Sequence, residues 1–196
     1  SLTVKGATTA ARTVTITNAK VDHALTVNVD GTGYKADGTA AQTVVADAAA
    51  KTITVNATGA NSSLALTGSA AAKTVNITGS ADLTLAALAS ATKIDGSAAT
   101  GGLTLGDLNA GTVTVSTGSG KDSFAIQATT KVTADAGAGD DTVTLKSALF
   151  EGSTLNLGAG NDKLLNNGGS VKTSTATAVT VIDAGDGTDT VSASLI

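Results

Sequence analysis

Residues 136–144 read A-G-A-G-D-D-T-V-T, a glycine-rich turn that leads directly into a strand-forming segment. Gly137 and Gly139 indicate a tight turn whose backbone comes close to another part of the molecule. Asp140 and Asp141 put negative charge beside this turn, which suggests a positively charged neighbour. The Val and Thr residues that follow are typical of a β-strand. The importance of this stretch depends on whether it recurs.

The pattern G-x-G-x-D-x-apolar occurs four times, and the first glycines of successive copies are 19, 21 and 27 residues apart. The last and longest spacing predicts an insertion, which we assign to residues 165–178. The glycines of the four copies are Gly118, Gly120, Gly137, Gly139, Gly158, Gly160, Gly185 and Gly187. The aspartates are Asp122, Asp141, Asp162 and Asp189, and the apolar residues, which we expect to point inward, are Phe124, Val143, Leu164 and Val191.

Short segments that alternate Val, Ile or Leu with Thr, Asn or Ser recur along the chain, for example at 13–17, 52–56 and 112–116. Such alternation predicts strands with one buried and one exposed face. The first strand of each unit returns about every 20 residues. This period predicts an all-β fold, a right-handed parallel β-solenoid with the Gly-Asp turns stacked on one edge. An antiparallel sandwich is the alternative, and the absence of Trp and Pro argues against it.

The composition fits a thin core of small aliphatic side chains. Hydrophobic residues make up 41% of the 196 residues, yet there are only two Phe, one Tyr and no Trp or Met. The absence of Cys excludes disulfides and thiolate metal sites. No apolar run is long enough to predict a transmembrane helix.

The net charge of −4 is unevenly distributed. Residues 1–115 hold seven Asp and seven Lys or Arg, whereas residues 116–196 hold eight Asp, one Glu and five Lys, which accounts for the whole excess. We therefore expect two continuous parts, 1–115 without the repeated turn and 116–196 with it. An acidic chain of this kind predicts no nucleic-acid partner, and we expect no membrane insertion.

Turns that recur once per coil stack their aspartates in a column. Two carboxylates about 4–5 Å apart repel by roughly 3–4 kcal/mol at an effective dielectric near 20, so the column needs a neutralising charge. Carboxylates and backbone carbonyls, with no His or Cys nearby, form an all-oxygen site that favours Ca²⁺ over Mg²⁺. We predict calcium between successive turns, held by the motif glycines and aspartates, with Asp140 as an additional ligand.

The four copies resemble the RTX nonapeptide of calcium-binding β-roll proteins, which bacteria export by type I secretion. In that family, turn carbonyls and Asp carboxylates hold calcium between successive turns, which implies the same role for the motif residues of this chain. The chain departs from the family by having one such turn per coil. The first family glycine is also replaced, by Thr117, Ala136, Leu157 and Ala184.

The Thr-, Ala-, Ser- and Gly-rich, Cys-free composition also resembles bacterial surface-layer (S-layer) proteins. This resemblance implies an extracellular lattice subunit on the bacterial cell surface. Such a subunit contacts copies of itself in a calcium-dependent way and binds cell-surface polysaccharide through regions outside this chain.

Three alternatives remain open: the stalk or binding module of an RTX adhesin, an ice-binding protein, and the RTX segment of a secreted hydrolase. The ice-binding alternative depends on T-x-T pairs such as Thr52 and Thr54. No residues assemble a catalytic site, and the single histidine, His23, is expected at the surface. We therefore expect no enzymatic activity.

Overall fold

The computed structural model describes residues 1–7, 10–17, 22–128, 131–170 and 179–192. In these ranges the chain is an all-β parallel solenoid, as the sequence repeat predicts, and contains no helix. A helix able to cross a membrane is accordingly not found in the described part of the chain.

The described strands form two nine-stranded sheets in which all neighbouring strands are parallel. Successive strands alternate between the sheets, so each coil adds one strand to each. Sheet A contains β1 (Leu2–Lys5), β3 (His23–Asp30), β5 (Ala50–Ala57), β7 (Thr74–Gly79), β9 (Lys93–Ala99), β11 (Val113–Ser116), β13 (Val132–Asp135), β15 (Thr154–Asn156) and β17 (Val181–Asp183). Sheet B contains β2 (Arg12–Thr15), β4 (Thr43–Ala46), β6 (Ser62–Ala65), β8 (Leu83–Ala86), β10 (Leu103–Leu105), β12 (Ser123–Ile126), β14 (Thr142–Leu145), β16 (Lys163–Asn166) and β18 (Thr190–Val191).

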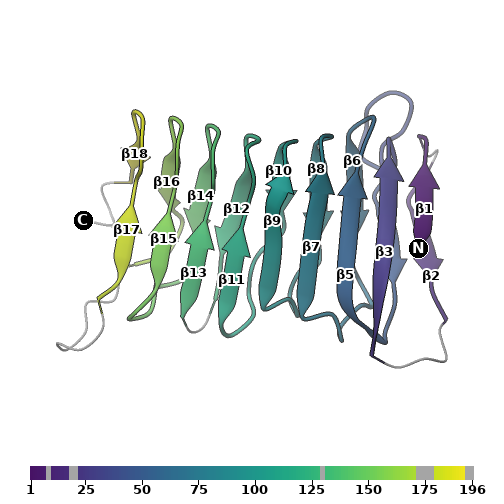
Figure 1. Cartoon of the computed structure of the whole chain (residues 1–196), viewed down its shortest axis with the longest axis horizontal. Helices are drawn as coiled ribbons and strands as arrows, with labels where there is room; N and C mark the ends of the chain where they lie inside the picture. The colour runs from purple at the N-terminus through teal and green to yellow at the C-terminus, as the bar shows by residue number, and fades with distance from the viewer. Residues whose placement is uncertain (8–9, 18–21, 129–130, 171–178, 193–196) are drawn as a thin grey trace.

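The coils stack along the long axis of the molecule, from β1 and β2 at one end to β17 and β18 at the other (Figure 1). Of the predicted insertion at 165–178, residues 171–178 lie outside the described residues. The strands on either side keep their places in the sheets: β17 pairs with β15, and β18 pairs with β16.

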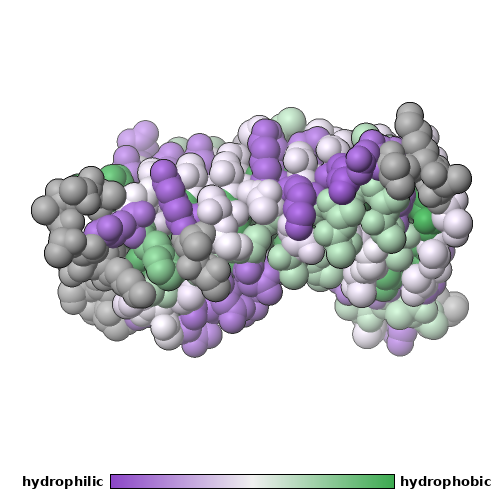
Figure 2. Space-filling view, turned by 90° about the horizontal axis from the view of Figure 1, so that it is seen from below, coloured by the Kyte–Doolittle hydropathy of each residue, from purple (hydrophilic) through white to green (hydrophobic). Residues whose placement is uncertain are grey.

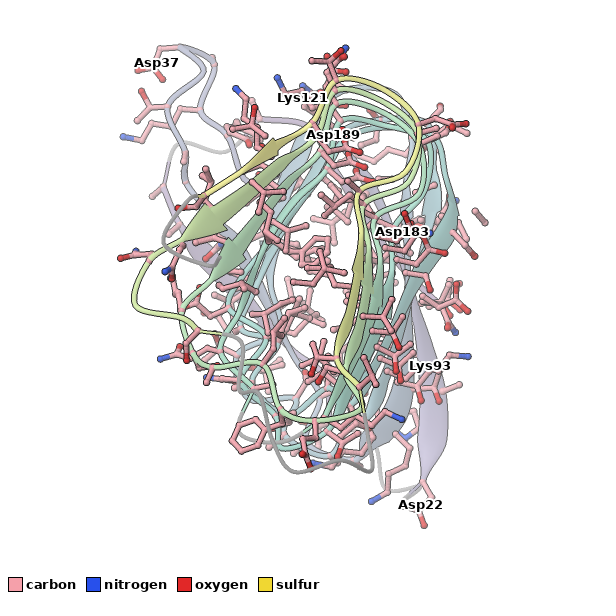
Figure 3. The ribbon with its side chains drawn as sticks, turned by 90° about the vertical axis from the view of Figure 1, so that its left-hand side faces the viewer. Asp22, Asp37, Lys93, Lys121, Asp183 and Asp189 are labelled. Atoms are coloured by element: carbon pink, nitrogen blue, oxygen red, sulfur yellow. The ribbon has the colours of Figure 1, made fainter. Side chains whose placement is uncertain are left out.

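The core consists of inward rows of small aliphatic residues between the two sheets. In one row of sheet A, Ile53 pairs with Val75, Val75 with Ile94, and Ile94 with Val115, and each is at most 1% exposed. Side chains of this kind fill the space between the sheets (Figure 3). The alternation within each short strand produces these rows because parallel, in-register pairing places like positions of successive coils side by side.

The two edges of the solenoid differ. At the upper edge in Figure 1, the chain passes from sheet A to sheet B, and the last four of these connections are the Gly-Asp turns. The lower edge carries irregular return loops, which are rich in alanine in the N-terminal half, where small apolar residues gather (Figure 2). Two shallow hollows of about 180 and 330 Å³ lie on these loops.

Residues 33–41 form a small excursion from the upper edge that covers part of sheet B. Tyr34 and Ala40 make an antiparallel bridge, and the Tyr34 hydroxyl lies 3.4 Å from Oγ1 of Thr84. Ser63 and Ala65 of β6 are each 3% exposed, although they alternate with the core-facing Leu64. The outer face of β6 is therefore buried as well as its inner face.

Candidate cation site in the stacked Gly-Asp turns

The four turns, defined as 117–122, 136–141, 157–162 and 184–189, lie directly above one another at one edge. Parallel bridges join Ala138 to Ala159 and Ala159 to Asp186. The carbonyl oxygens of Gly118, Gly137 and Gly158 each accept a hydrogen bond from an amide of the next turn, at 2.8–2.9 Å. The predicted stacking therefore occurs, and the carbonyl of the first glycine in these turns helps to hold the stack together.

Glycine is required in these turns because successive backbones almost touch. A Cβ placed on Gly158 would lie 1.8 Å from the carbonyl oxygen of Gly137, and one on Gly185 would lie 1.7 Å from that of Gly158. Gly158 also has a φ of +98°, a conformation that other residues adopt at a cost. A side chain at these positions would force neighbouring coils apart.

The four aspartates form a hydrogen-bonded column, which we call the aspartate ladder: Asp122, Asp141, Asp162 and Asp189. In each step, Oδ1 of one aspartate accepts the backbone amide of the aspartate one coil earlier. The N···O distances are 2.7 Å from Asp122 to Asp141, 2.8 Å from Asp141 to Asp162 and 2.9 Å from Asp162 to Asp189. At the start of the ladder, the amide of Leu103 donates to Oδ1 of Asp122 at 2.7 Å.

The ladder lies inside the turns. Asp122, Asp141 and Asp162 are each 1% exposed, and Asp189 in the last described coil is partly exposed. Viewed along the solenoid, Asp189 lies within the curve of its turn, whereas Lys121 projects outward from the stack (Figure 3). Sheet register places Asp122 beside Leu103, which pairs with Leu83. The ladder therefore continues an inward row that is apolar in the two preceding coils and polar at Ser62, one coil earlier still.

Burial raises the pKa of three ladder carboxyl groups. It raises the pKa of Asp141 to about 7, with the neighbouring carboxylates adding to the rise and the hydrogen bond from the Asp122 amide opposing it. Burial likewise raises the pKa of Asp162 and of Asp122. At Asp122 the amides of Leu103 and Gly118 oppose the rise in pKa, whereas ionising Asp141 and Asp162 in the fold is unfavourable unless a positive charge compensates.

The Oδ2 atoms of the ladder aspartates show where a compensating positive charge is needed. Oδ2 of Asp141 and Oδ2 of Asp162 are fully buried and have no hydrogen-bond partner. A buried, unpartnered oxygen of a charged group is costly, and it requires either a proton or a cation. The stacked turns also carry the neighbouring ladder carboxylates and the glycine carbonyls, and such oxygen donors are the ones that hard cations prefer. These residues therefore fit a calcium ion.

The oxygen atoms that could hold a cation come from successive turns, and they do not form a dense cluster of acidic side chains. No group of three or more His, Asp or Glu side chains suited to a metal occurs among the residues that the structure describes. A cation at this edge would thus be shared between ladder carboxylates of neighbouring turns and backbone oxygens.

Asp140, the additional ligand proposed from the sequence, lies on the solvent side of its turn. Its Oδ1 accepts the backbone amide of Asn161 at 2.9 Å and the Asn161 side-chain amide at 3.3 Å. These hydrogen bonds lower the pKa of Asp140, and the charges of Lys121 and Lys163 lower it further. Asp140 therefore already has partners that favour its ionised form, and it links the second turn to the third.

Other residues at this edge were not identified from the motif. The carboxylates of Asp135 and Asp183 accept the amides of Gly137 and Gly185 within their own turns, at 3.2 and 3.1 Å. The recurring D-A-G at 135–137 and 183–185 was the available signal. Asp82 instead links two coils that lack the motif, because its Oδ1 accepts the amide of Gly102 one coil later at 2.8 Å, as Asp140 accepts that of Asn161.

The inward apolar positions are confirmed in three of the four copies. Phe124, Val143 and Leu164 are at most 2% exposed, whereas Val191 is 38% exposed. Val191 lies on β18, and among the described strands none stacks on the far side of β18.

The prediction that His23 is a surface residue is wrong. Its side chain is only 11% exposed, and Nε2 lies 2.8 Å from Oδ2 of the buried Asp47. Asp47 also accepts the amides of Ala49 and Ala50 at 3.1 Å, so the pair fastens the loop after β4 to the start of β3. Pairing between coils brings these residues together, and the sequence around His23 gives no sign of it.

The stacked turns and the ladder are thus established by the geometry of this chain alone. Comparisons of the chain with protein-family models, with curated proteins and with solved structures found no match.

Proposed function

We propose that this chain is a structural, calcium-stabilised module that acts outside the cell as a building block of a bacterial surface layer. The observation that supports the calcium part is the pair of buried, unpartnered oxygens, Oδ2 of Asp141 and Oδ2 of Asp162. A divalent cation between the turns would complete their coordination and offset the repulsion along the ladder.

The residues of the chain prepare this site. The glycines let the turns approach closely, and the amide bonds to Oδ1 fix the carboxylates in register, so the second oxygens are held in place. Bound calcium would supply the positive charge that lets the ladder carboxylates stay ionised inside the fold. Because the site exists only when the coils are stacked, binding free energy becomes folding free energy.

The extracellular and surface-layer parts of the proposal rest on the resemblance of the motif and composition, including export by type I secretion. They agree with a calcium requirement, because calcium is plentiful outside cells. In this reading the protein has no enzymatic activity, and its partners are copies of itself. The ladder carboxylates are buried structural groups, which are inaccessible to a substrate.

A second candidate is a spacer or stalk in an adhesin, and the shape of the solenoid favours it. The described coils form a single rod with the strands across its long axis (Figure 1). An ice-binding face has less support. Thr52 and Thr54 lie in sheet A, whereas Thr13 and Thr15, like Thr142 and Thr144, lie in sheet B.

The test is a calcium titration from excess chelator to several millimolar, followed by circular dichroism and light scattering, with magnesium as the control ion. A calcium-specific gain of β signal with rising scatter supports a calcium-folded, self-assembling protein. A gain of β signal without scatter supports the stalk. If neither signal responds to calcium, the proposal is wrong.

A further inference from the structure

The four Gly-Asp turns are unequal in how they satisfy their aspartates. In the first turn, Oδ2 of Asp122 accepts the amide of Gly118 at 3.2 Å. With the Leu103 amide on Oδ1, both oxygens of Asp122 have partners. In the second and third turns, the corresponding Oδ2 atoms of Asp141 and Asp162 have none.

This difference between the first turn and the others is accompanied by a difference at one sequence position, directly before the first glycine. The residue before the first glycine is Thr117 in the first turn, but Ala136, Leu157 and Ala184 in the others. Only threonine carries a hydroxyl. The Thr117 hydroxyl donates to the carbonyl oxygen of Ala136 at 2.6 Å, so it ties the first turn, one residue before Gly118, to the backbone of the second turn. Its position is inside the stack, because Thr117 is 3% exposed.

The backbone of the first turn differs too. The glycines of the other three turns all have positive φ, between +83° and +148°, and Gly118 and Gly120 do not. In the second turn the amide of Gly137 donates to Asp135, two residues earlier, whereas in the first turn the amide of Gly118 donates to Asp122. The first turn thus directs its own amide toward its ladder aspartate.

We propose that two hydrogen bonds of the first turn take the place of a cation, so that cation dependence begins at Asp141: the Gly118 amide donates to Asp122, and the Thr117 hydroxyl holds this part of the turn against Ala136 of the next turn. This inference rests on the proposed calcium role of the ladder. In this proposal the turn at 117–122 forms without metal. It joins the coils of residues 1–115 to the calcium-dependent coils that follow. Calcium then binds at the second and later turns, which stack on a first turn that is already formed.

Two reciprocal substitutions test this inference. Thr117→Ala removes the hydroxyl from the first turn, and Ala136→Thr introduces one at the same position of the second turn. The matched control is Thr133→Ala, which removes a threonine hydroxyl from the exposed face of β13. The measurements are the number of calcium ions bound per chain, by isothermal titration calorimetry, and the urea midpoint in chelator and in calcium.

Thr117→Ala is expected to bind an additional calcium ion, and its urea midpoint should fall in chelator and recover in calcium. Ala136→Thr is expected to bind fewer ions and to have a higher midpoint in chelator. Thr117→Ser, which keeps the hydroxyl, should behave like the parent protein. If Thr117→Ala does not fold, the number of calcium ions bound by Ala136→Thr tests the inference on its own.

Two results would overturn the inference, and they can be told apart. If the parent protein binds calcium but both substitutions leave its stoichiometry and its chelator midpoint at the level of Thr133→Ala, Thr117 is not a cation substitute. If the parent protein itself binds no calcium, the proposed function fails and this inference fails with it.

Discussion

The backbone amide of Asp141 donates a hydrogen bond of 2.8 Å to Oδ1 of Asp162, which lies one coil further along the solenoid. This bond fixes the second oxygen of Asp162 inside the turn, where it has no partner. The same contact therefore sets the register between the coils and holds Oδ2 of Asp162 where it requires a proton or a cation. The predictions below test the two consequences separately.

The pH dependence of the calcium-free protein should run opposite to that of a protein held together by ordinary salt bridges. Burial raises the pKa of Asp141 to about 7 from an ordinary value of 3.8. Between these values the folded state binds a proton that the unfolded state releases, so stability falls as pH rises through this window. Urea midpoints in chelator should be higher at pH 5 than at pH 8.

Calcium should remove this trend, because the cation replaces the proton at the ionised carboxylate. An Asp141→Asn variant, which has no titrating group there, should show a weaker pH trend in chelator. A calcium-free midpoint that increases from pH 5 to pH 8 would contradict the assignment.

Asp141→Asn and Asp162→Asn should separate folding from calcium binding. Asparagine keeps an oxygen that can accept the amide from the preceding coil but removes the buried charge. We expect the free energy of unfolding in chelator to stay equal or to rise by about 1 kcal/mol, and the stabilisation by calcium to shrink. Chemical denaturation with and without calcium measures both effects.

The matched control for these variants is Asp140→Asn, on the solvent side of the same turn. It should leave the urea midpoint close to that of the parent protein and leave the calcium response intact. If Asp140→Asn abolishes the response while Asp141→Asn preserves it, the cation site lies on the outer face of the turn.

The close approach of the turns predicts a large cost for Gly158→Ala. The new Cβ would meet the carbonyl oxygen of Gly137 at 1.8 Å, at a φ of +98°, so we expect a loss of roughly 3 kcal/mol or more. Gly6→Ala is the control, because Gly6 has a φ of +79° but nothing within 4 Å of the new atom. It should cost about 1 kcal/mol. Equal losses in thermal unfolding would show that backbone strain, rather than stacking, sets the requirement.

The buried pair of His23 and Asp47 should be important for the N-terminal coils. Asp47→Ala removes the contact with His23 and leaves the amides of Ala49 and Ala50 without their acceptor, so we expect a loss of roughly 2 kcal/mol. Asp37→Ala removes a similar bond, to the Thr39 amide, at an exposed position and should leave the urea midpoint close to that of the parent protein. Urea denaturation of both variants distinguishes them, and similar losses would refute a special role for Asp47.

Much of the fold could be predicted from short-range patterns. Alternation of Val with Thr identified the strands, and the return of G-x-G-x-D at near-constant spacing indicated stacked coils. The excursion at 33–41 and its burial of Ser63 could not be predicted in this way. Its contacts, such as that between Tyr34 and Thr84, join positions 50 residues apart, and nothing in the local sequence specifies them.

The candidate site was predictable in part. The motif identified the residues of the ladder, and simple electrostatics indicated that a column of aspartates needs a cation. The partners of each carboxylate oxygen were not predictable. Whether Oδ2 receives a backbone amide, as in Asp122, or nothing, as in Asp141, depends on how one turn sits on the next.

The sequence by itself therefore determined the solenoid, its turn edge and the identity of the ladder, because alternation, glycine conformation and charge act between near neighbours or at a fixed repeat. Only the tertiary structure decided that Asp141 and Asp162 are buried with an unpartnered oxygen while Asp122 is satisfied by the amides of Leu103 and Gly118. The physical reason is that hydrogen-bond partners across coils are set by the register of the strands and by the close approach of successive backbones, which arise only when the coils stack.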